Sequence, residues 1–217
     1  MLESKKHVFW QALFLTCFFF ILGLVFGVYL EQNRGDNFNT AFYQSEVSLY
    51  DSLALAKLSE SNLTSCGEFR DSVIAFADKI YEESRELEKF DEKNSLTESL
   101  KTIHRKYDLL RTLLWINAID AKGKCGQLNT VVYLYVYDTE DIGIKSEQVA
   151  WSRALSDLKQ EQGNRIILIP IAVDSDLSTL DSLTKKFQIQ DYPAVVINEK
   201  RVIYDIEQAS EIKNYLE

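Results

Sequence analysis

Three cysteines are the residues of this chain with the most chemistry open to them, and two of them share a local context. Cys66 lies in "TSCGEF" and Cys125 in "KGKCGQ", so each is followed by a glycine. Two such thiols can form a structural disulfide, remain separate, or cycle between oxidised and reduced states. Catalytic pairs usually lie close in sequence at a helix N-terminus, where the helix dipole lowers a thiol pKa, so the wide separation favours a structural bridge.

The other residue types predict little chemistry. The two histidines, His7 and His104, are too far apart in sequence to predict a zinc cluster, and His104 is expected to be a surface or half-buried side chain. The acidic residues between Glu82 and Glu88 suit a solvated helix face, because calcium binding needs a tighter loop. Without a phosphate loop or a dinucleotide fingerprint, the sequence predicts no metal, no cofactor and no catalytic residue. A net charge of −9 without a basic stripe argues against a nucleic-acid partner.

The segment from Val8 to Leu30 is the one strongly apolar stretch. It has no charged residue over 23 positions, and ~20 apolar residues are enough for a helix to cross a bilayer. Trp10 and Tyr29 lie near its ends, as interfacial aromatic residues do. A secretory signal peptide is the alternative, but its apolar region would be shorter and no small-residue cleavage site follows. The pattern therefore favours an uncleaved signal-anchor that binds the lipid bilayer through residues 8–30.

The flanks of this segment predict its orientation. Lys5 and Lys6 precede it, whereas Glu31 and Asp36 follow it, so the positive-inside rule places residues 1–7 in the cytoplasm. The expected location is a cell membrane, crossed once, with the C-terminal part extracytoplasmic. Gly23 and Gly27 have the spacing that permits close helix pairing, which would allow a homodimer; simple packing against lipid is the alternative.

The region from residue 31 to 122 is predicted to be helical. Apolar residues recur with helical spacing from Asn37 to about Glu60, from Cys66 to about Phe90 and from Ser95 to about Ala121. Three helices with short connections should pack as antiparallel neighbours.

Antiparallel packing would bring Cys66 and Cys125 to the same end of the second and third helices. We therefore predict a disulfide between them, as suits an oxidising exterior; two unrelated thiols and a redox-active pair are the alternatives. Cys17, inside the apolar segment, is expected to act as a small hydrophobic residue. Asn62 begins an "NLT" glycosylation sequon in the connection just before Cys66.

The period changes near residue 129. "TVVYLYVYD", from Thr130 to Asp138, is β-branched and aromatic throughout, which suits a strand buried on both faces. A helix ending at Gly163, the strand "RIILIPIAVD", a helix through "SDLSTLDSLTKKF", two strands joined near Asn198–Lys200 and a final helix follow. The order βαβαββα predicts an α/β or α+β domain over residues 129–217.

That order, with the "VDSD" strand exit and the "KKFQIQDYPAVVIN" run, resembles the thioredoxin-like superfamily over residues 129–217. The resemblance implies that Pro193 is cis and forms one wall of a site in which the backbone of Tyr192 pairs with an extended peptide. It also implies that the second strand lies at the sheet edge, where Pro170 would be tolerated.

The loop after the first strand departs from the family pattern. Oxidoreductases of this type carry Cys-x-x-Cys there, whereas residues 138–146 contain no cysteine, which excludes dithiol exchange at that position. Ser146 is expected to cap the following helix, and a nucleophilic role for it is disfavoured because residues 129–217 contain no histidine base.

Two classes of function remain. The favoured one is a membrane-tethered, redox-inactive module that binds an envelope protein or an extended peptide by strand addition beside Tyr192 and Pro193. The alternative is a thiol-disulfide oxidoreductase, or an accessory to one, that uses Cys66 and Cys125.

Overall fold

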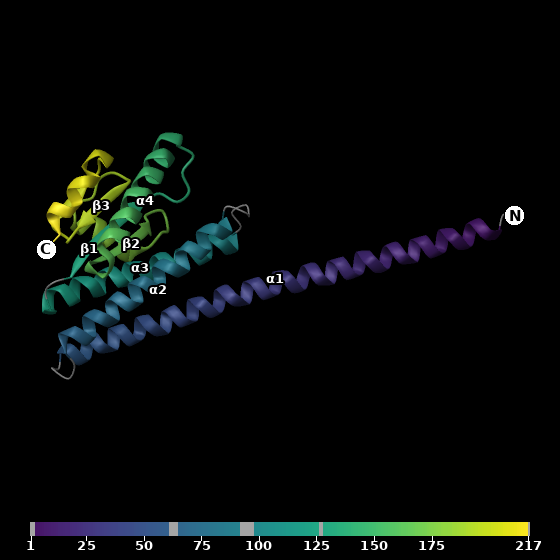
Figure 1. The fold of residues 1–217 in the computed structure, drawn as a ribbon, viewed down its shortest axis with the longest axis horizontal. Helices are drawn as coiled ribbons and strands as arrows, with labels where there is room; N and C mark the ends of the chain where they lie inside the picture. Colours follow the sequence, from purple (N-terminus) through teal and green to yellow (C-terminus); the bar gives the residue numbers. More distant parts are fainter. Residues whose placement is uncertain (1–2, 61–64, 92–97, 126–127, 217) are drawn as a thin grey trace. The chain divides into compact units, whose positions relative to one another are not determined.

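The computed structural model describes the backbone of residues 3–60, 65–91, 98–125 and 128–216 (Figure 1). Side chains are described chiefly for residues 7–30, 65–83, 101–123 and 128–206. The chain divides into two compact units, residues 1–44 and 45–217, and each is described by itself.

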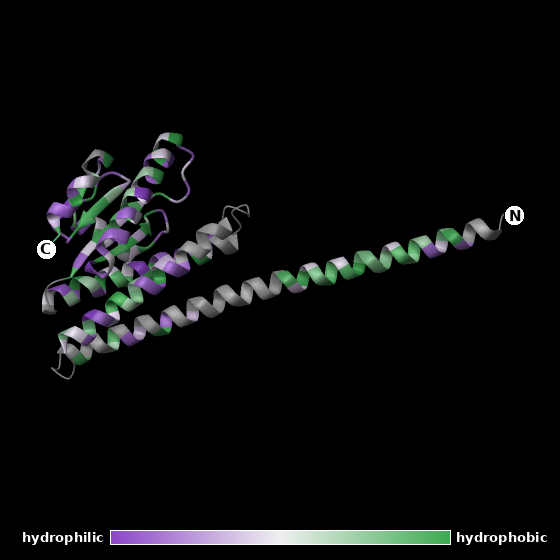
Figure 2. Ribbon diagram, viewed as in Figure 1, coloured by the Kyte–Doolittle hydropathy of each residue, from purple (hydrophilic) through white to green (hydrophobic). Residues whose placement is uncertain are grey.

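A single helix, α1 (Glu3–Glu60), forms the N-terminal part of the chain. Within it, His7–Leu30 is long and apolar enough to cross a membrane, as the colouring by hydropathy shows (Figure 2). Its described side chains are exposed. The structure therefore contains a helix that could cross a membrane where the span was predicted, whereas its orientation and the pairing at Gly23 and Gly27 stay predictions. Residues 31–36, between the predicted span and the helix predicted from Asn37, are helical as well. Residues 31–36 contain no proline, and one glycine in a helix costs only ~1 kcal/mol.

The next two helices form a hairpin. α2 (Cys66–Asp91) and α3 (Glu98–Cys125) lie side by side in Figure 1 and are joined by a short connection, so they run antiparallel as predicted. A capping box defines where α2 begins: the Ser65 amide donates to Glu68 Oε2 at 2.9 Å and the Glu68 amide to Ser65 Oγ at 3.3 Å. Most side chains of the predicted third partner, residues 37–60 of α1, lie outside the described residues.

The C-terminal part alternates strands and helices in the predicted order. Its elements are β1 (Asn129–Tyr135), α4 (Ile142–Gln162), β2 (Ile166–Ala172), α5 (Ser178–Lys186), β3 (Ala194–Ile197), β4 (Arg201–Ile203) and the 3-10 helix η2 (Ile206–Tyr215). A one-turn 3-10 helix, η1 (Gly163–Arg165), follows α4. The terminal element is thus a 3-10 helix where an α-helix was expected.

The strands form one mixed sheet in the order β2-β1-β3-β4. β1 and β2 are parallel, whereas β3 is antiparallel to both β1 and β4. β2 therefore lies at an edge, and the expectation that Pro170 belongs to an edge strand is confirmed. The fold is a mixed α and β structure; its assignment to the thioredoxin-like superfamily stays a prediction.

Both faces of β1 are buried. Val131 and Tyr133 join the core beneath α4, which contributes Trp151 and Leu155. The alternate residues Val132 and Leu134 are completely buried as well. A strand covered on both faces explains why its sequence is uninterrupted by polar residues after Thr130.

The hairpin between β3 and β4 is closed by Asn198 and Glu199, whose φ angles are +52° and +56°. The register pairs Ile197 with Arg201, so three residues join β3 to β4. Asn198 and Glu199 are central to the turn in which the Lys200 amide donates to the Ile197 carbonyl at 3.0 Å, and positive φ at both suits the twist of the flanking strands. Asparagine tolerates this region, but glutamate does not favour it. Glu199 is held there because its Oε1 accepts hydrogen bonds from Trp115 Nε1, at 3.1 Å, and from Thr130 Oγ1.

Candidate functional site

The predicted peptide site lies at the end of the sheet where β1 ends. The register pairs Leu134 with Ala194, so the antiparallel entry of β3 brings Tyr192 and Pro193 beside the β1 exit. The Tyr192–Pro193 peptide bond is cis, as the resemblance implied. Pro193 is buried and Tyr192 half-buried. Burial raises the pKa of the Tyr192 phenol, and a hydrogen bond with Thr184 opposes that shift.

The loop between β1 and α4 uses its polar groups to build structure. The Asp174 carboxylate accepts hydrogen bonds from the amides of Tyr137, at 2.9 Å, and Asp138, at 2.8 Å. The Asp141 carboxylate accepts from the amides of Gly143, at 2.7 Å, and Ile144, at 3.2 Å, which caps α4. These contacts fix the backbone of the loop between β1 and α4.

The expectation that Ser146 caps α4 is wrong. The helix begins at Ile142, one turn earlier, because Asp141 supplies the capping carboxylate. Ser146 lies inside the helix, and its hydroxyl donates to the Ile142 carbonyl at 2.8 Å. The predicted end of this helix at Gly163 is confirmed, since Gly163 adopts a φ of +55°.

The cysteines are only partly described. Cys66 is exposed at the start of α2 and is disulfide-bonded, whereas Cys17 is an exposed free thiol. The side chain of Cys125 and the whole of Asn62 lie outside the described residues. The Cys66–Cys125 pairing and the glycosylation of Asn62 therefore stay predictions.

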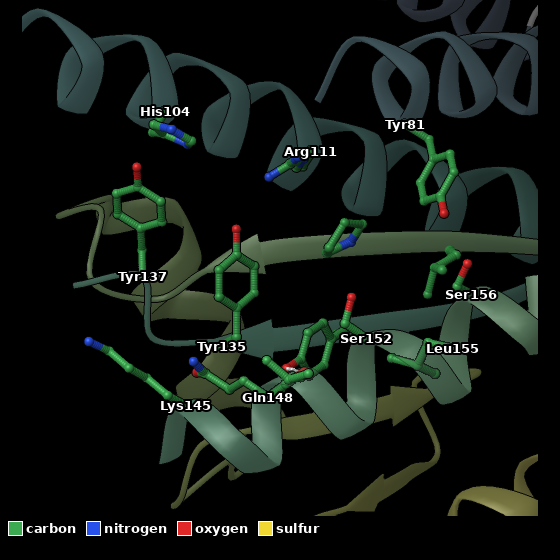
Figure 3. A pocket seen from close by; sticks show the side chains of 14 residues that line it. Tyr81, His104, Arg111, Tyr135, Tyr137, Lys145, Gln148, Ser152, Leu155 and Ser156 are labelled. Atoms are coloured by element: carbon green, nitrogen blue, oxygen red, sulfur yellow. Dashed lines mark hydrogen bonds between the residues drawn. The ribbon is translucent and has the colours of Figure 1, made fainter. Parts of the chain in front are cut away.

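A cavity of about 490 Å³ lies between α3, α4 and the edge strand β2 (Figure 3). Tyr133, Tyr135 and Tyr137 line it from β1 and the residues after it, and Leu168 and Pro170 line it from β2. His104 and Arg111 project into it from α3, and Tyr81 from α2. The α4 residues in the lining are Lys145, Gln148, Val149, Ser152, Leu155 and Ser156.

Aromatic rings in the lining of this cavity pack against one another. Tyr133 and Tyr135 stack at 5.5 Å between ring centroids, and the His104 ring lies 4.2 Å from that of Tyr137. His104 is only 8% exposed, so the expected surface or half-buried position understated its burial. Burial also raises the pKa of Tyr133, whose neutral hydroxyl donates to the Gln148 carbonyl at 3.3 Å.

Gln148, which lines the cavity, pairs with the backbone of Val136, the residue just past β1. Its Oε1 accepts from the Val136 amide at 2.7 Å, while its Nε2 donates to the Val136 carbonyl at 3.1 Å. The side chain thus replaces a neighbouring strand at the point where β1 leaves the sheet.

A buried ion pair borders the cavity. Arg111 Nη1 lies 3.2 Å from Asp108 Oδ1, and the two side chains are 4% and 2% exposed. The same carboxylate accepts the Ala172 amide of β2 at 3.1 Å, so α3 satisfies a backbone donor on the open edge of the sheet. Burial raises the pKa of Asp108, although Arg111 opposes the shift.

Sequence patterns did not point to this cavity. Lys145, Gln148, Val149, Ser152 and Ser156 follow helical spacing along one face of α4, and the tyrosines of β1 alternate. Both patterns also suit solvent-facing or core positions, so neither distinguishes a pocket without the neighbouring helices.

Among the residues that the structure describes, no cluster of His, Cys, Asp and Glu could hold a metal ion. Searches of family models, of curated proteins and of solved structures found no match to this chain.

Proposed function

We propose that this chain is a single-pass membrane protein whose extracytoplasmic part is a redox-inactive, thioredoxin-like binding module for an envelope protein or an extended peptide. The observation behind the proposal is the segment that follows β1, residues 136–144. It contains no cysteine, and its backbone amides donate hydrogen bonds to the carboxylates of Asp174 and Asp141. Such an end of the sheet has a shape that can hold a chain but no group that can exchange a disulfide with it.

The peptide would dock beside Tyr192. An extended segment adding alongside the entry of β3 gains affinity from main-chain hydrogen bonds. The exposed carboxylates of the loop after β1 and of the residues before Pro193 are Asp138, Glu140, Asp141 and Asp191, of which Asp138 pairs with Lys101 at 3.4 Å. An acidic rim of this kind favours a peptide that carries lysine or arginine, because complementary charge speeds encounter and sets specificity.

The test uses the full chain in lipid nanodiscs and an array of nine-residue peptides. We expect the bound peptides to be enriched in lysine and arginine, and the best of them to lose binding when alternate amides are N-methylated. Asp191→Lys should weaken binding by about tenfold, whereas the matched variant Asp157→Lys on the exposed side of α4 should leave it unchanged. Equal binding of N-methylated peptides would show that strand addition is not the mode of recognition.

A thiol-disulfide oxidoreductase remains the second candidate, because the bonded Cys66 is exposed and hence accessible to another thiol. Insulin reduction and exchange with a glutathione buffer distinguish the two. The binding module predicts no turnover and a Cys66 bond that is reduced only after unfolding. Rapid reduction of the folded protein, with turnover lost in Cys66→Ser, would favour the oxidoreductase.

A further inference from the structure

The cavity between α3, α4 and β2 is a site separate from the predicted peptide site, because neither Tyr192 nor Pro193 lines it. Its volume of about 490 Å³ falls in the range of ~300 to 1,000 Å³ that small-molecule sites occupy. We propose that it binds a small organic anion that has a flat, aromatic or apolar body and one carboxylate group.

The body of the ligand is recognised by the aromatic and aliphatic wall. Four tyrosines line the cavity, and the stacked pair Tyr133 and Tyr135 presents rigid ring surface. Val149, Leu155, Leu168 and Pro170 complete the apolar lining. Pro170 has no N–H, so the β2 edge lacks a donor there and offers apolar surface in its place. Flat rings gain both buried area and stacking from such a wall.

Three polar side chains of α4 line the cavity and make no hydrogen bond or ion pair with any other described residue. Lys145, Ser152 and Ser156 are separated by seven and four residues, which places them on one face of the helix. An ammonium and two hydroxyls directed at a cavity can therefore bind a ligand without breaking an internal contact.

The charge of the lining selects an anion. The chain has 33 acidic residues and a net charge of −9, yet among the residues that the structure describes no Asp or Glu lines this cavity, whereas Lys145 and Arg111 do. Arg111 pairs with Asp108, which does not itself line the cavity. Of the two cationic side chains in the lining, Lys145 is the one that pairs with no described carboxylate, so the carboxylate of a ligand would be its partner.

The two ends of the cavity differ, and this difference orients the ligand. Figure 3 shows His104, Tyr137 and Lys145 gathered at one end and Tyr81, Leu155 and Ser156 at the other. We expect the carboxylate to lie beside Lys145, and the body to extend along the tyrosines towards Leu155. A compound with the same body and no charge should therefore bind less tightly.

The experiment compares 2-naphthoate with its neutral isostere 2-naphthamide by equilibrium dialysis against the full chain in lipid nanodiscs. Empty nanodiscs correct for partition into lipid. The proposal predicts saturable binding of naphthoate that exceeds that of the amide by about fivefold, as one partly exposed ion pair provides. Binding no greater than that of empty nanodiscs, or equal binding of the two compounds, would overturn it.

Two matched pairs of variants locate the site. Lys145→Gln should remove the preference for naphthoate, whereas Arg153→Gln removes a cation from α4 outside the lining and should retain it. Ser152→Phe should fill the cavity and abolish binding of both compounds, whereas Ser146→Phe, elsewhere on the exposed part of α4, should not. If the members of either pair behave alike, the compounds bind elsewhere and the proposal fails.

The result is independent of the peptide proposal. Ser152→Phe leaves Tyr192 and the acidic rim untouched, so peptide binding should persist in the variant that no longer binds naphthoate. Loss of peptide binding in Asp191→Lys should likewise leave naphthoate binding intact.

Discussion

The buried pair of Asp108 and Arg111 gives the sharpest prediction about stability. Replacing Asp108 by asparagine keeps an oxygen that can accept the Ala172 amide, now 3.1 Å from the carboxylate, but removes the charge opposite Arg111. The guanidinium, which is more than nine-tenths buried, then loses the carboxylate charge of Asp108. Breaking a buried pair costs up to ~3 to 5 kcal/mol. We expect a smaller loss of about 1 kcal/mol in Asp108→Asn, because the backbone hydrogen bond survives and because burial, which raises the pKa of Asp108, already disfavours its charge.

A double-mutant cycle tests the cause of that loss. Arg111→Met removes the cation, and Asp108→Asn with Arg111→Met removes both charges at nearly constant volume. Because the double variant leaves no buried ion, its cost should fall below the sum of the single costs by at least ~2 kcal/mol. The exposed pair Lys101 and Asp138, 3.4 Å apart, is the control and should contribute less than ~1 kcal/mol.

Urea unfolding of the full chain in nanodiscs measures these free energies through tryptophan fluorescence. Trp115 and Trp151 are completely buried, so both report loss of the folded domain. Costs of the single variants that add within ~0.5 kcal/mol would refute the argument, since independent sites behave in that way. The loss would then come from packing around each side chain and not from their pairing.

Three further predictions concern pH, the hairpin and the cysteines. Burial raises the pKa of Asp108, so the folded state holds this proton more tightly than the unfolded state does, and the stability of the wild type relative to Asp108→Asn should fall as the pH rises from about 4 to about 7. Urea titrations of both proteins at the two pH values measure this difference in stability. A difference that grows in favour of the wild type as the pH rises would show that the charge of Arg111 outweighs burial. Glu199→Ala should destabilise the fold by ~1 to 2 kcal/mol, because Trp115 and Thr130 lose the oxygen that accepts their hydrogen bonds. Glu199→Gly should cost less than Glu199→Ala, because glycine adopts the φ of +56° at this position without backbone strain. A thermal scan in which both variants match the wild type would contradict this. Cys66→Ser and Cys125→Ser should each cost ~2 to 4 kcal/mol, with no further cost in the double variant, if the two form one bridge; additive costs would disprove the pairing.

Local patterns predicted the elements whose signals lie within a few residues. The β1 sequence, the hairpin near Asn198 and the helix end at Gly163 were all identifiable, because strand burial and positive φ leave marks in adjacent residues. The edge position of Pro170 followed from the missing N–H together with the order of elements. The start of α4 was less well predicted: Asp141 and Ser146 are both good capping residues, and only the structure shows which carboxylate or hydroxyl meets the free amides.

The cavity was out of reach of local patterns because its walls come from α2, α3, α4 and both parallel strands. Lys145 and Ser152 in a helix suit a solvated face equally well, so the sequence does not show that a second layer stands opposite them. That layer is the hairpin of α2 and α3, which the sequence predicted without indicating where it packs.

Asp108 explains why the hairpin packs there. An edge strand exposes unpaired amides, and β2 exposes that of Ala172 on the side away from β1. The carboxylate of α3 satisfies this amide, Arg111 neutralises the carboxylate, and the helix is thereby held beside the edge at the level of residue 172. Two and four residues earlier the same strand has Pro170 and Leu168, where apolar side chains line the cavity. The buried pair and the cavity are thus two consequences of covering one sheet edge with a helix, so weakening the pair in Asp108→Asn should also weaken naphthoate binding, even though Asp108 does not line the cavity.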